Sequence, residues 1–238
     1  MIVGIVGAIQ DEILLLVNKI NNKTKEIYHS YLFHIGYYHK IKIIVLQTGI
    51  GKVSASIATT LLILLYKPNI IINIGSAGSI HNLLKPGDLI IPNLISYYDV
   101  NLIDFNYKIG QIPGCPQFFT ANDKLLKIYK KNIIKNYFQY MEGDLVTGDI
   151  FVNNQIIIKT IKKNFPTAIA VEMESAAIAH VCYKFNIPFL IIRSISDYAN
   201  KTGYMNFKKY ITLSSKNNFN ILEYILIYLN QNNHILNS

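Results

Sequence analysis

Two of the six glutamates in this chain, Glu172 and Glu174, interrupt the apolar segment IAVEMESAAIAH at 169–180. Carboxylates are costly to bury unless a partner or a ligand compensates their charge. On an extended backbone the i, i+2 spacing directs both acids to one face and Met173 to the other. Arg193, the sole arginine, is on a strand that we expect to be adjacent and could neutralise the pair. Paired carboxylates can accept two neighbouring hydroxyl groups, which suits a ribose diol.

Two further acids have both a chemical and a structural interpretation. Glu12 falls in the first turn of a predicted helix, where the helix dipole stabilises a carboxylate and keeps it ionised, as a general base requires. Asp197 follows Ser194 and Ser196, so it fits a helix cap as well as a site residue. Glu174 likewise fits an ordinary acid at the start of a helix. No single acid decides between the two interpretations.

Glycine-rich segments and one aromatic residue are further candidates. GIGK at 49–52 lacks the spacing of a phosphate loop, and TGIGKVS has two of the three glycines of a dinucleotide fingerprint, so we reject both. NIGSAG at 73–78 fits either a turn where a ligand approaches the backbone or a tight packing site. Phe151, in GDIFVNN, is either a core residue or a platform on which a flat base stacks.

The elements that must position these residues alternate between strands and helices. We expect strands at 1–7, two antiparallel strands in 31–49 around a turn near Gly36, and strands at 69–75, after Pro86, near 144–147, at 168–173 and at 188–195. We expect helices from Gln10, at 52–66, 121–136, 154–164 with an Asn154 cap, from Glu174 to Phe185, and at 206–230. This alternation predicts an α/β fold with three layers, α/β/α, around a twisted, mixed but mostly parallel sheet.

Sites in such sheets lie beyond the carboxyl ends of the strands. Four predicted strand ends carry polar or glycine-rich sequence, which would gather Glu12, Ser76, Glu172, Glu174, Arg193, Ser196 and Asp197. The concentration of acids where the fold predicts a cleft carries more weight than any one residue.

Composition limits the class of protein. The 238 residues, 51% of them hydrophobic and 16% charged, fit a single domain spanning 1–238 with a packed core. The longest apolar runs, such as LLILLY at 61–66, are too short to span a membrane, and we expect no signal peptide. Two cysteines provide neither a disulfide framework nor a metal cluster, so we expect a cytoplasmic protein without a metal.

The formal charge of +9 comes from 22 lysines and one arginine, and the lysines are mostly scattered. Base readout and bidentate phosphate contacts favour arginine, and no nucleic-acid-binding motif is present. We therefore expect no nucleic-acid partner.

Long motifs in order carry a resemblance: GIVGAIQDE, LQTGIGKVSA, NIGSAG, LKPGD, QIPGCP, GDIFVNN, NFPTAIAVEME, AVEMESAAIAHVC and PFLIIRSISDYAN. Together they cover essentially the whole chain and resemble the nucleoside phosphorylase and nucleosidase superfamily. Within it, the chain is most similar to the 5′-methylthioadenosine/S-adenosylhomocysteine nucleosidase family. The resemblance implies hydrolysis of adenine nucleosides in methionine salvage, with no cofactor and with a homodimer as the working unit.

The resemblance also implies roles for particular residues. Glu12 matches the base that activates water, and Asp197 matches the acid that protonates the purine N7. Glu174 with Met173 matches the ribose-binding pair, and Phe151 the stacking aromatic. The resemblance further places Val152 at the adenine edge, Ser76 and Arg193 near the water, Ile50 and Phe207 near the sugar and 5′-substituent, and Leu102, Phe105 and Pro113 in the neighbouring subunit's pocket.

The nucleophile can be argued from the residues themselves. Phosphorylases clamp a phosphate dianion, generally with several arginines, and this chain has one. Ionised Glu12 would also repel phosphate, so we expect water to attack the sugar. The alternatives are a purine or uridine phosphorylase and a binding protein that kept the fold but lost the chemistry. The sequence does not rank methylthioadenosine, S-adenosylhomocysteine and 5′-deoxyadenosine as substrates.

Overall fold

The computed structural model describes residues 1–136, 138–200 and 203–232, which form a sheet flanked by helices. The strands are β1 (Ile2–Gly7), β2 (Asn21–Tyr28), β3 (Tyr31–Tyr38), β4 (Ile41–Gln47), β5 (Ile70–Ser79), β6 (Leu89–Tyr97), β7 (Tyr140–Thr147), β8 (Ala168–Glu172) and β9 (Phe189–Tyr198). Their order in the sheet is β2-β3-β4-β1-β5-β8-β7-β6-β9, and β5 also pairs with β9. This additional pairing closes five strands into a ring, whereas β2 remains a free edge.

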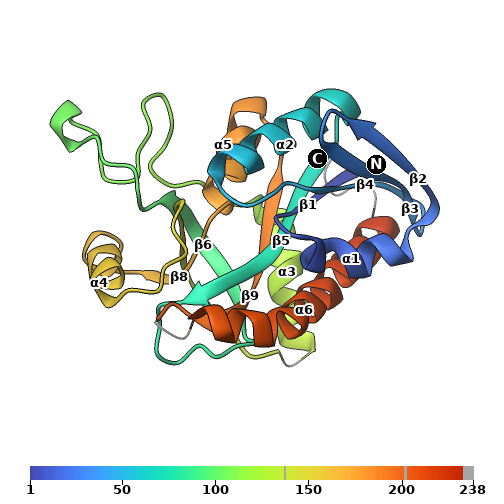
Figure 1. The fold of residues 1–238 in the computed structure, drawn as a ribbon. Coiled ribbons are helices and arrows are strands. Elements are labelled where there is room, and N and C mark those ends of the chain that lie inside the picture. The colour runs from blue at the N-terminus through green and yellow to red at the C-terminus, as the bar shows by residue number, and fades with distance from the viewer. Residues whose placement is uncertain (137, 201–202, 233–238) are drawn as a thin grey trace.

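Helices cover both sides of the sheet (Figure 1). They are α1 (Gln10–Lys19), α2 (Lys52–Tyr66), α3 (Asp123–Lys135), α4 (Gln155–Asn164), α5 (Ser175–Phe185) and α6 (Gly203–Gln231), with a short 3-10 helix η1 (Ile103–Phe105). α2 packs against α5 on one side, and α6 packs against α1 and α3 on the other. The predicted three-layer α/β/α fold is therefore confirmed, whereas the closure of part of the sheet was not predicted.

The sheet is mixed, as predicted. Five pairings are parallel: β1–β4, β1–β5, β5–β9, β6–β7 and β7–β8. Four are antiparallel: β2–β3, β3–β4, β5–β8 and β6–β9. The aliphatic runs that predicted buried strands lie between the helical layers, and Ile70, Ile71 and Ile72 on β5 are fully buried. No described helix has the length and apolar character needed to cross a bilayer.

Two strands extend further than predicted. β5 continues to Ser79, so the expected Gly-Ser-Ala-Gly turn is part of the strand. A Cβ atom on Gly75 would lie 2.8 Å from Arg193 Nη1, so glycine is needed there for a close approach rather than for a turn. β9 continues to Tyr198, so Asp197 is in a strand and the helix-cap interpretation is wrong. Small and polar residues hid both extensions, because they lower the apparent strand propensity.

The N-terminal hairpins also differ from the prediction. β3 runs through Gly36, and the turn to β4 lies at 39–40, where His39 has a φ of 52°, in the left-handed region. A side chain at Gly36 would collide with Ile20 and with the carbonyl oxygen of Asn21, which explains the glycine. Strand β2 was missed because its sequence, NNKTKEIY, has no apolar face, and every one of its residues is exposed.

One strand neighbour was predicted wrongly. Arg193 is on β9, which pairs with β5 and β6, whereas β8 lies between β5 and β7. The side chain of Arg193 nevertheless reaches Glu172, with 3.0 Å between Nη2 and Oε2. The expected ion pair therefore forms, although β8 and β9 are not paired with each other.

A β-bulge interrupts the parallel pairing of β5 with β9. Ala77 is opposite Ile195, but Gly78 is opposite Asp197, so Ser196 is an extra residue in β9. Because side chains alternate along a strand, an extra residue changes the face that every following side chain occupies. The bulge therefore sets the direction of Asp197.

Candidate active site

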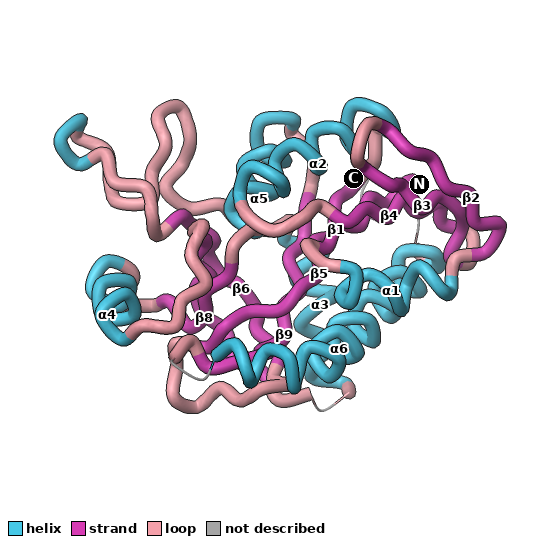
Figure 2. The backbone as a smooth tube through the Cα atoms, in the orientation of Figure 1, coloured by secondary structure: helices cyan, strands magenta, loops and turns pink. Residues whose placement is uncertain are grey.

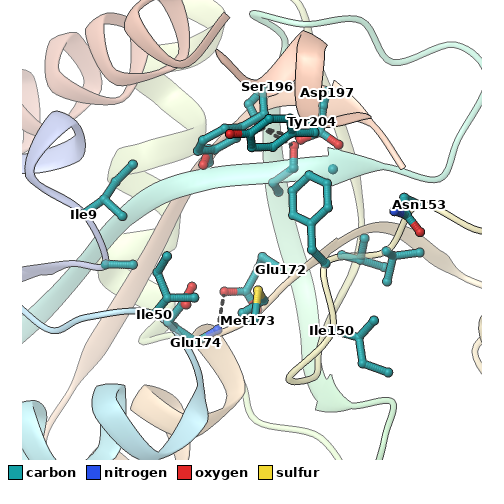
Figure 3. Close-up of a pocket in the computed structure, with 18 of the residues that line it drawn as sticks. Ile9, Ile50, Ile150, Asn153, Glu172, Met173, Glu174, Ser196, Asp197 and Tyr204 are labelled. Carbon is teal, nitrogen blue, oxygen red and sulfur yellow. Dashed lines mark hydrogen bonds between the residues drawn. The ribbon is translucent and has the colours of Figure 1, made fainter. Parts of the chain in front are cut away.

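A cavity of about 570 Å³ lies beside the ring and collects four acids from three segments (Figure 3). Its lining includes Glu12, Ile50, Ser76, Phe151, Val152, Glu172, Met173, Glu174, Ser196, Asp197 and Phe207. All eleven were candidates from the sequence. The cavity therefore lies where the polar ends of the strands predicted a cleft.

Glu12 is held at one end of the cavity by four hydrogen-bond donors. Its Oε2 accepts the backbone N–H groups of Ala8 at 2.8 Å and Ile9 at 3.2 Å. Its Oε1 accepts the N–H of Ser76 at 2.9 Å and the hydroxyl of Ser76 at 3.1 Å. These four donors fix the orientation of the Glu12 carboxyl at the cavity wall.

Asp197 is buried at another part of the cavity wall. Its Oδ1 accepts the hydroxyl of Ser196 at 2.8 Å. A Cβ atom on Gly78 or Gly203 would come within 3.0 or 3.2 Å of Oδ2, so both glycines leave room for this carboxyl. Burial raises the pKa of Asp197 to about 6, and the hydrogen bond from Ser196 opposes the rise. An acid with this pKa is partly protonated near neutral pH and can donate a proton.

Glu172 and Arg193 belong to a buried network that reaches the cavity wall at Glu172. Arg193 is 1% exposed. Its Nη2 donates to Glu172 Oε2 at 3.0 Å, Asn73 Oδ1 at 2.5 Å and Ser175 Oγ at 2.8 Å. Glu172 also accepts the N–H groups of Glu174 and Ser175 and the hydroxyl of Thr147. Arg193 is the one sequence-predicted residue of this group that does not line the cavity.

Glu174 is less constrained than Glu172. It is the first residue before α5, but its side chain turns away from that helix, and Oε1 accepts the N–H of Gly51 at 2.8 Å. Burial and the nearby charge of Glu172 raise the pKa of Glu174 to about 8, whereas the Gly51 N–H and Arg193 lower it. Figure 3 shows Glu174 close to Ile50 and Met173 at the cavity wall. A carboxyl with one protein donor retains acceptor capacity for a ligand.

Aromatic and aliphatic side chains form the remaining walls. The ring of Phe151 meets that of Phe207 edge to face, with 6.3 Å between the centroids. Val152 is buried, whereas Ile50 is 60% exposed at the rim. Such walls accommodate a flat base and an apolar substituent.

Leu102, Phe105 and Pro113 lie elsewhere. They belong to the segment around η1, which projects away from the ring (Figures 1 and 2). Phe105 is 71% exposed, and none of the three lines the cavity of its own chain. Across the described ranges, no cluster of three or more His, Cys, Asp or Glu side chains could hold a metal ion.

Comparisons with known proteins identify the family. Residues 2–227 match the phosphorylase superfamily. A 5′-methylthioadenosine/S-adenosylhomocysteine nucleosidase of Buchnera aphidicola subsp. Acyrthosiphon pisum (strain Tuc7) is 50% identical over 215 residues, which cover 90% of this chain and 93% of the relative. This chain belongs to the 5′-methylthioadenosine/S-adenosylhomocysteine nucleosidases. A second nucleosidase of that name, from Buchnera aphidicola subsp. Schizaphis graminum (strain Sg), is 44% identical over 236 residues and is covered completely.

Solved structures support the placement among these nucleosidases. The nucleosidase of Colwellia psychrerythraea 34H, in complex with adenine, has a TM-score of 0.92 and 36% identity, over 95% of this chain and 94% of that one. A futalosine hydrolase of Helicobacter pylori strain 26695 has a TM-score of 0.91 and 31% identity, over 96% and 98% of the two chains. The predicted resemblance is confirmed, and the second structure marks a related hydrolase with the same fold.

Several lining residues of this nucleosidase were not predicted as site residues: Ala8, Ile9, Ala77, Gly78, Ile150, Asn153, Val171 and Tyr204. Gly78 could have been found, because glycine in a strand marks a close approach. Tyr204 could not, because nothing in the sequence around it distinguishes a cavity-facing tyrosine from a surface one.

Proposed function

We propose that this chain hydrolyses the N-glycosidic bond of 5′-methylthioadenosine, S-adenosylhomocysteine and 5′-deoxyadenosine. The products are adenine and the corresponding 5-substituted ribose. Bond breaking leaves positive charge on the sugar and negative charge on the departing base. The cavity offers an acid and a base for these two ends, and its relatives carry the name of this activity.

Three carboxyl groups divide the chemistry. Asp197, with its raised pKa, donates a proton to the purine N7 as the bond breaks. Glu12 orients and deprotonates water, assisted by Ser76, on the other face of the sugar. Glu174 accepts hydrogen bonds from the ribose diol and, in its ionised form, stabilises the cation-like ring together with Met173. Phe151 stacks on adenine, and Val152 reads its edge through backbone groups.

The position of Arg193 is the observation that favours water over phosphate as the nucleophile. The only guanidinium of the chain is enclosed among Glu172, Asn73 and Ser175 and does not line the cavity. A phosphate dianion would therefore find no arginine to bind it and would meet the carboxylate of Glu12. Arg193 influences the water only indirectly, from the other side of Gly75. A Cβ atom on Gly75 would be 2.8 Å from Arg193 Nη1 and 3.1 Å from Glu12 Oε1, so the guanidinium lies close to the Glu12 carboxyl.

We also propose that two copies of the chain form the working enzyme in the cytoplasm. Leu102, Phe105 and Pro113 are supplied by one subunit to close the 5′-substituent pocket of the other. The exposure of Phe105 on a projecting segment supports this assignment. Measurement of the mass of the protein in solution tests it, and a monomer with full activity would contradict it.

Release of free adenine tests the function directly. The protein is incubated with each of the three nucleosides, and with futalosine because a related hydrolase acts under that name. We expect adenine from the first three at a rate that does not change when phosphate is added. A rate that increases with phosphate, together with formation of a sugar phosphate, would instead identify a phosphorylase.

A further inference from the structure

A second group of charged residues lies at the start of α2, outside the cavity. Lys52 Nζ is 2.6 Å from Asp99 Oδ2 and 3.9 Å from Asp149 Oδ2. Asp99 Oδ2 also accepts the N–H of Asp149 at 3.0 Å, and Asp149 Oδ1 accepts the N–H of Lys52 at 2.7 Å. We call Lys52, Asp99 and Asp149 the loop clamp. None of the three lines the cavity.

The loop clamp supplies a hydrogen-bond acceptor to the N-terminus of α2, which has no capping side chain of its own. α2 begins after Gly51, which has a φ of 94° and no side chain to cap the helix. The first N–H groups of a helix have no partner within it and attract negative charge. Here two consecutive groups are met by carboxylates from different segments: Gly51 N–H by Glu174 and Lys52 N–H by Asp149. One carboxylate faces the cavity and the other lies outside it.

The side chains beside the joined groups are only partly buried. Ile50, beside Gly51, is 60% exposed, and Phe151, two residues after Asp149, is 40% exposed. Side chains this exposed contribute little burial energy to fix their loops. Gly148 is buried and its N–H donates to a backbone carbonyl, so this segment also has an anchor of its own. The hydrogen bond from Lys52 N–H to Asp149 joins the start of α2 directly to this anchored segment.

We propose that Asp149 is a positioning residue for sugar recognition. By holding the N–H of Lys52, it keeps the preceding N–H of Gly51 directed at Glu174, and this orients the Glu174 carboxylate toward the ribose hydroxyls. The inference rests on the proposed role of Glu174. Sugar recognition then depends on the start of α2 as well as on Glu174. Asp149, a carboxylate outside the cavity, acquires a function in this way.

The test compares two substrates that differ at the sugar. Asp149→Ala is assayed with 5′-methylthioadenosine and with its 3′-deoxy analogue. We expect kcat/KM for the parent to fall by about 10- to 100-fold, the range for a hydrogen bond to a charged group, and to fall much less for the analogue. The preference of the enzyme for the 3′-hydroxyl therefore shrinks. Asp149→Asn keeps an oxygen acceptor for Lys52 N–H and restores most of the preference.

Two further variants keep the proposal falsifiable. Asp99→Ala removes the partner of Lys52 Nζ and of Asp149 N–H, so it should reduce the preference less than Asp149→Ala; it also provides the readout if Asp149→Ala does not fold. The matched control is Glu142→Ala, which breaks the similarly short Lys130–Glu142 ion pair of 2.6 Å away from the cavity and should leave the preference unchanged.

The outcomes separate this inference from the proposed function. A wild-type protein that releases no adenine, or that does not prefer the 3′-hydroxyl, contradicts the proposed function or the role of Glu174. A wild-type protein that shows both, with the preference unchanged in Asp149→Ala and Asp99→Ala, overturns only the inference about Asp149. Equal losses on the two substrates would overturn it as well, because they indicate a general structural effect.

Discussion

Glu172 and Glu174 are two residues apart, yet the structure uses them differently. Glu172 accepts from Thr147, from Arg193 and from two backbone N–H groups, all within a buried network. Glu174 accepts from the N–H of Gly51 and has its carboxyl at the cavity. Within this pair, the four protein donors of Glu172 tie it to the buried network, whereas Glu174 retains acceptor capacity for a ligand. The number of donors does not decide the role by itself, because Glu12 also accepts from four donors and lines the cavity.

The largest expected effect is on the cavity side of this comparison. Asp197→Asn should bind substrate but lose turnover by about 10²- to 10⁴-fold, because the amide cannot donate the proton that the departing base needs. Measurement of kcat together with the affinity for a non-hydrolysed analogue checks this. Glu12→Gln should lose turnover similarly through the water. Near-normal hydrolysis by Asp197→Asn would remove Asp197 from the acid role.

The network side of the comparison should affect stability. Arg193→Met leaves Glu172 buried without its ion-pair partner, and removing one partner of a buried pair typically costs about 3–5 kcal/mol in the free energy of unfolding. Denaturant unfolding measures the loss. Glu174→Gln is the matched control, since it changes a buried glutamate two residues away but should keep the wild-type unfolding midpoint while impairing activity. An equal loss of stability in both variants would contradict the division of roles.

A smaller effect is expected from pH. Burial raises the pKa of Asp197 to about 6, so the protonated acid is present below that pH and is lost as the pH rises through it. Glu174, whose pKa is raised to about 8, would titrate in the same range, so the measurement uses Glu174→Gln, in which this second group is absent. In that variant we expect kcat/KM to decline above about pH 6, by up to about tenfold per pH unit. The pH profile of adenine release measures the decline. A profile of this variant that stays flat between pH 5 and 8 would show that a group other than Asp197 supplies the proton.

The sequence predicted the contents of the site better than its construction. Acids at the ends of apolar runs located Glu12, Glu174 and Asp197 at one cavity, because parallel strands bring their carboxyl ends to the same edge. It did not predict that β5 and β9 would pair and close a ring, since that pairing joins distant segments and leaves no local pattern. The placement of Arg193 behind the wall follows from this closure, and so it was also missed.

Local chemistry explains the other differences. Glycines that indicated turns at Gly36 and Gly75 in fact make room for neighbouring atoms inside strands, and sequence alone does not distinguish the two uses. The assignment of Leu102, Phe105 and Pro113 to a second subunit remains a prediction, because it concerns contacts that one chain cannot contain.

The bulge at Ser196 has a wider consequence for how this enzyme could lose or change its activity. The side of the sheet on which the carboxyl of Asp197 emerges depends on residue count along β9, not on the chemistry of its neighbours. Shortening this strand by a single position would turn the acid toward the opposite layer while every reactive group stayed in the chain. Under the proposed role of Asp197, activity thus depends partly on the number of residues between fixed points of β9, which a comparison of residue identities alone would overlook.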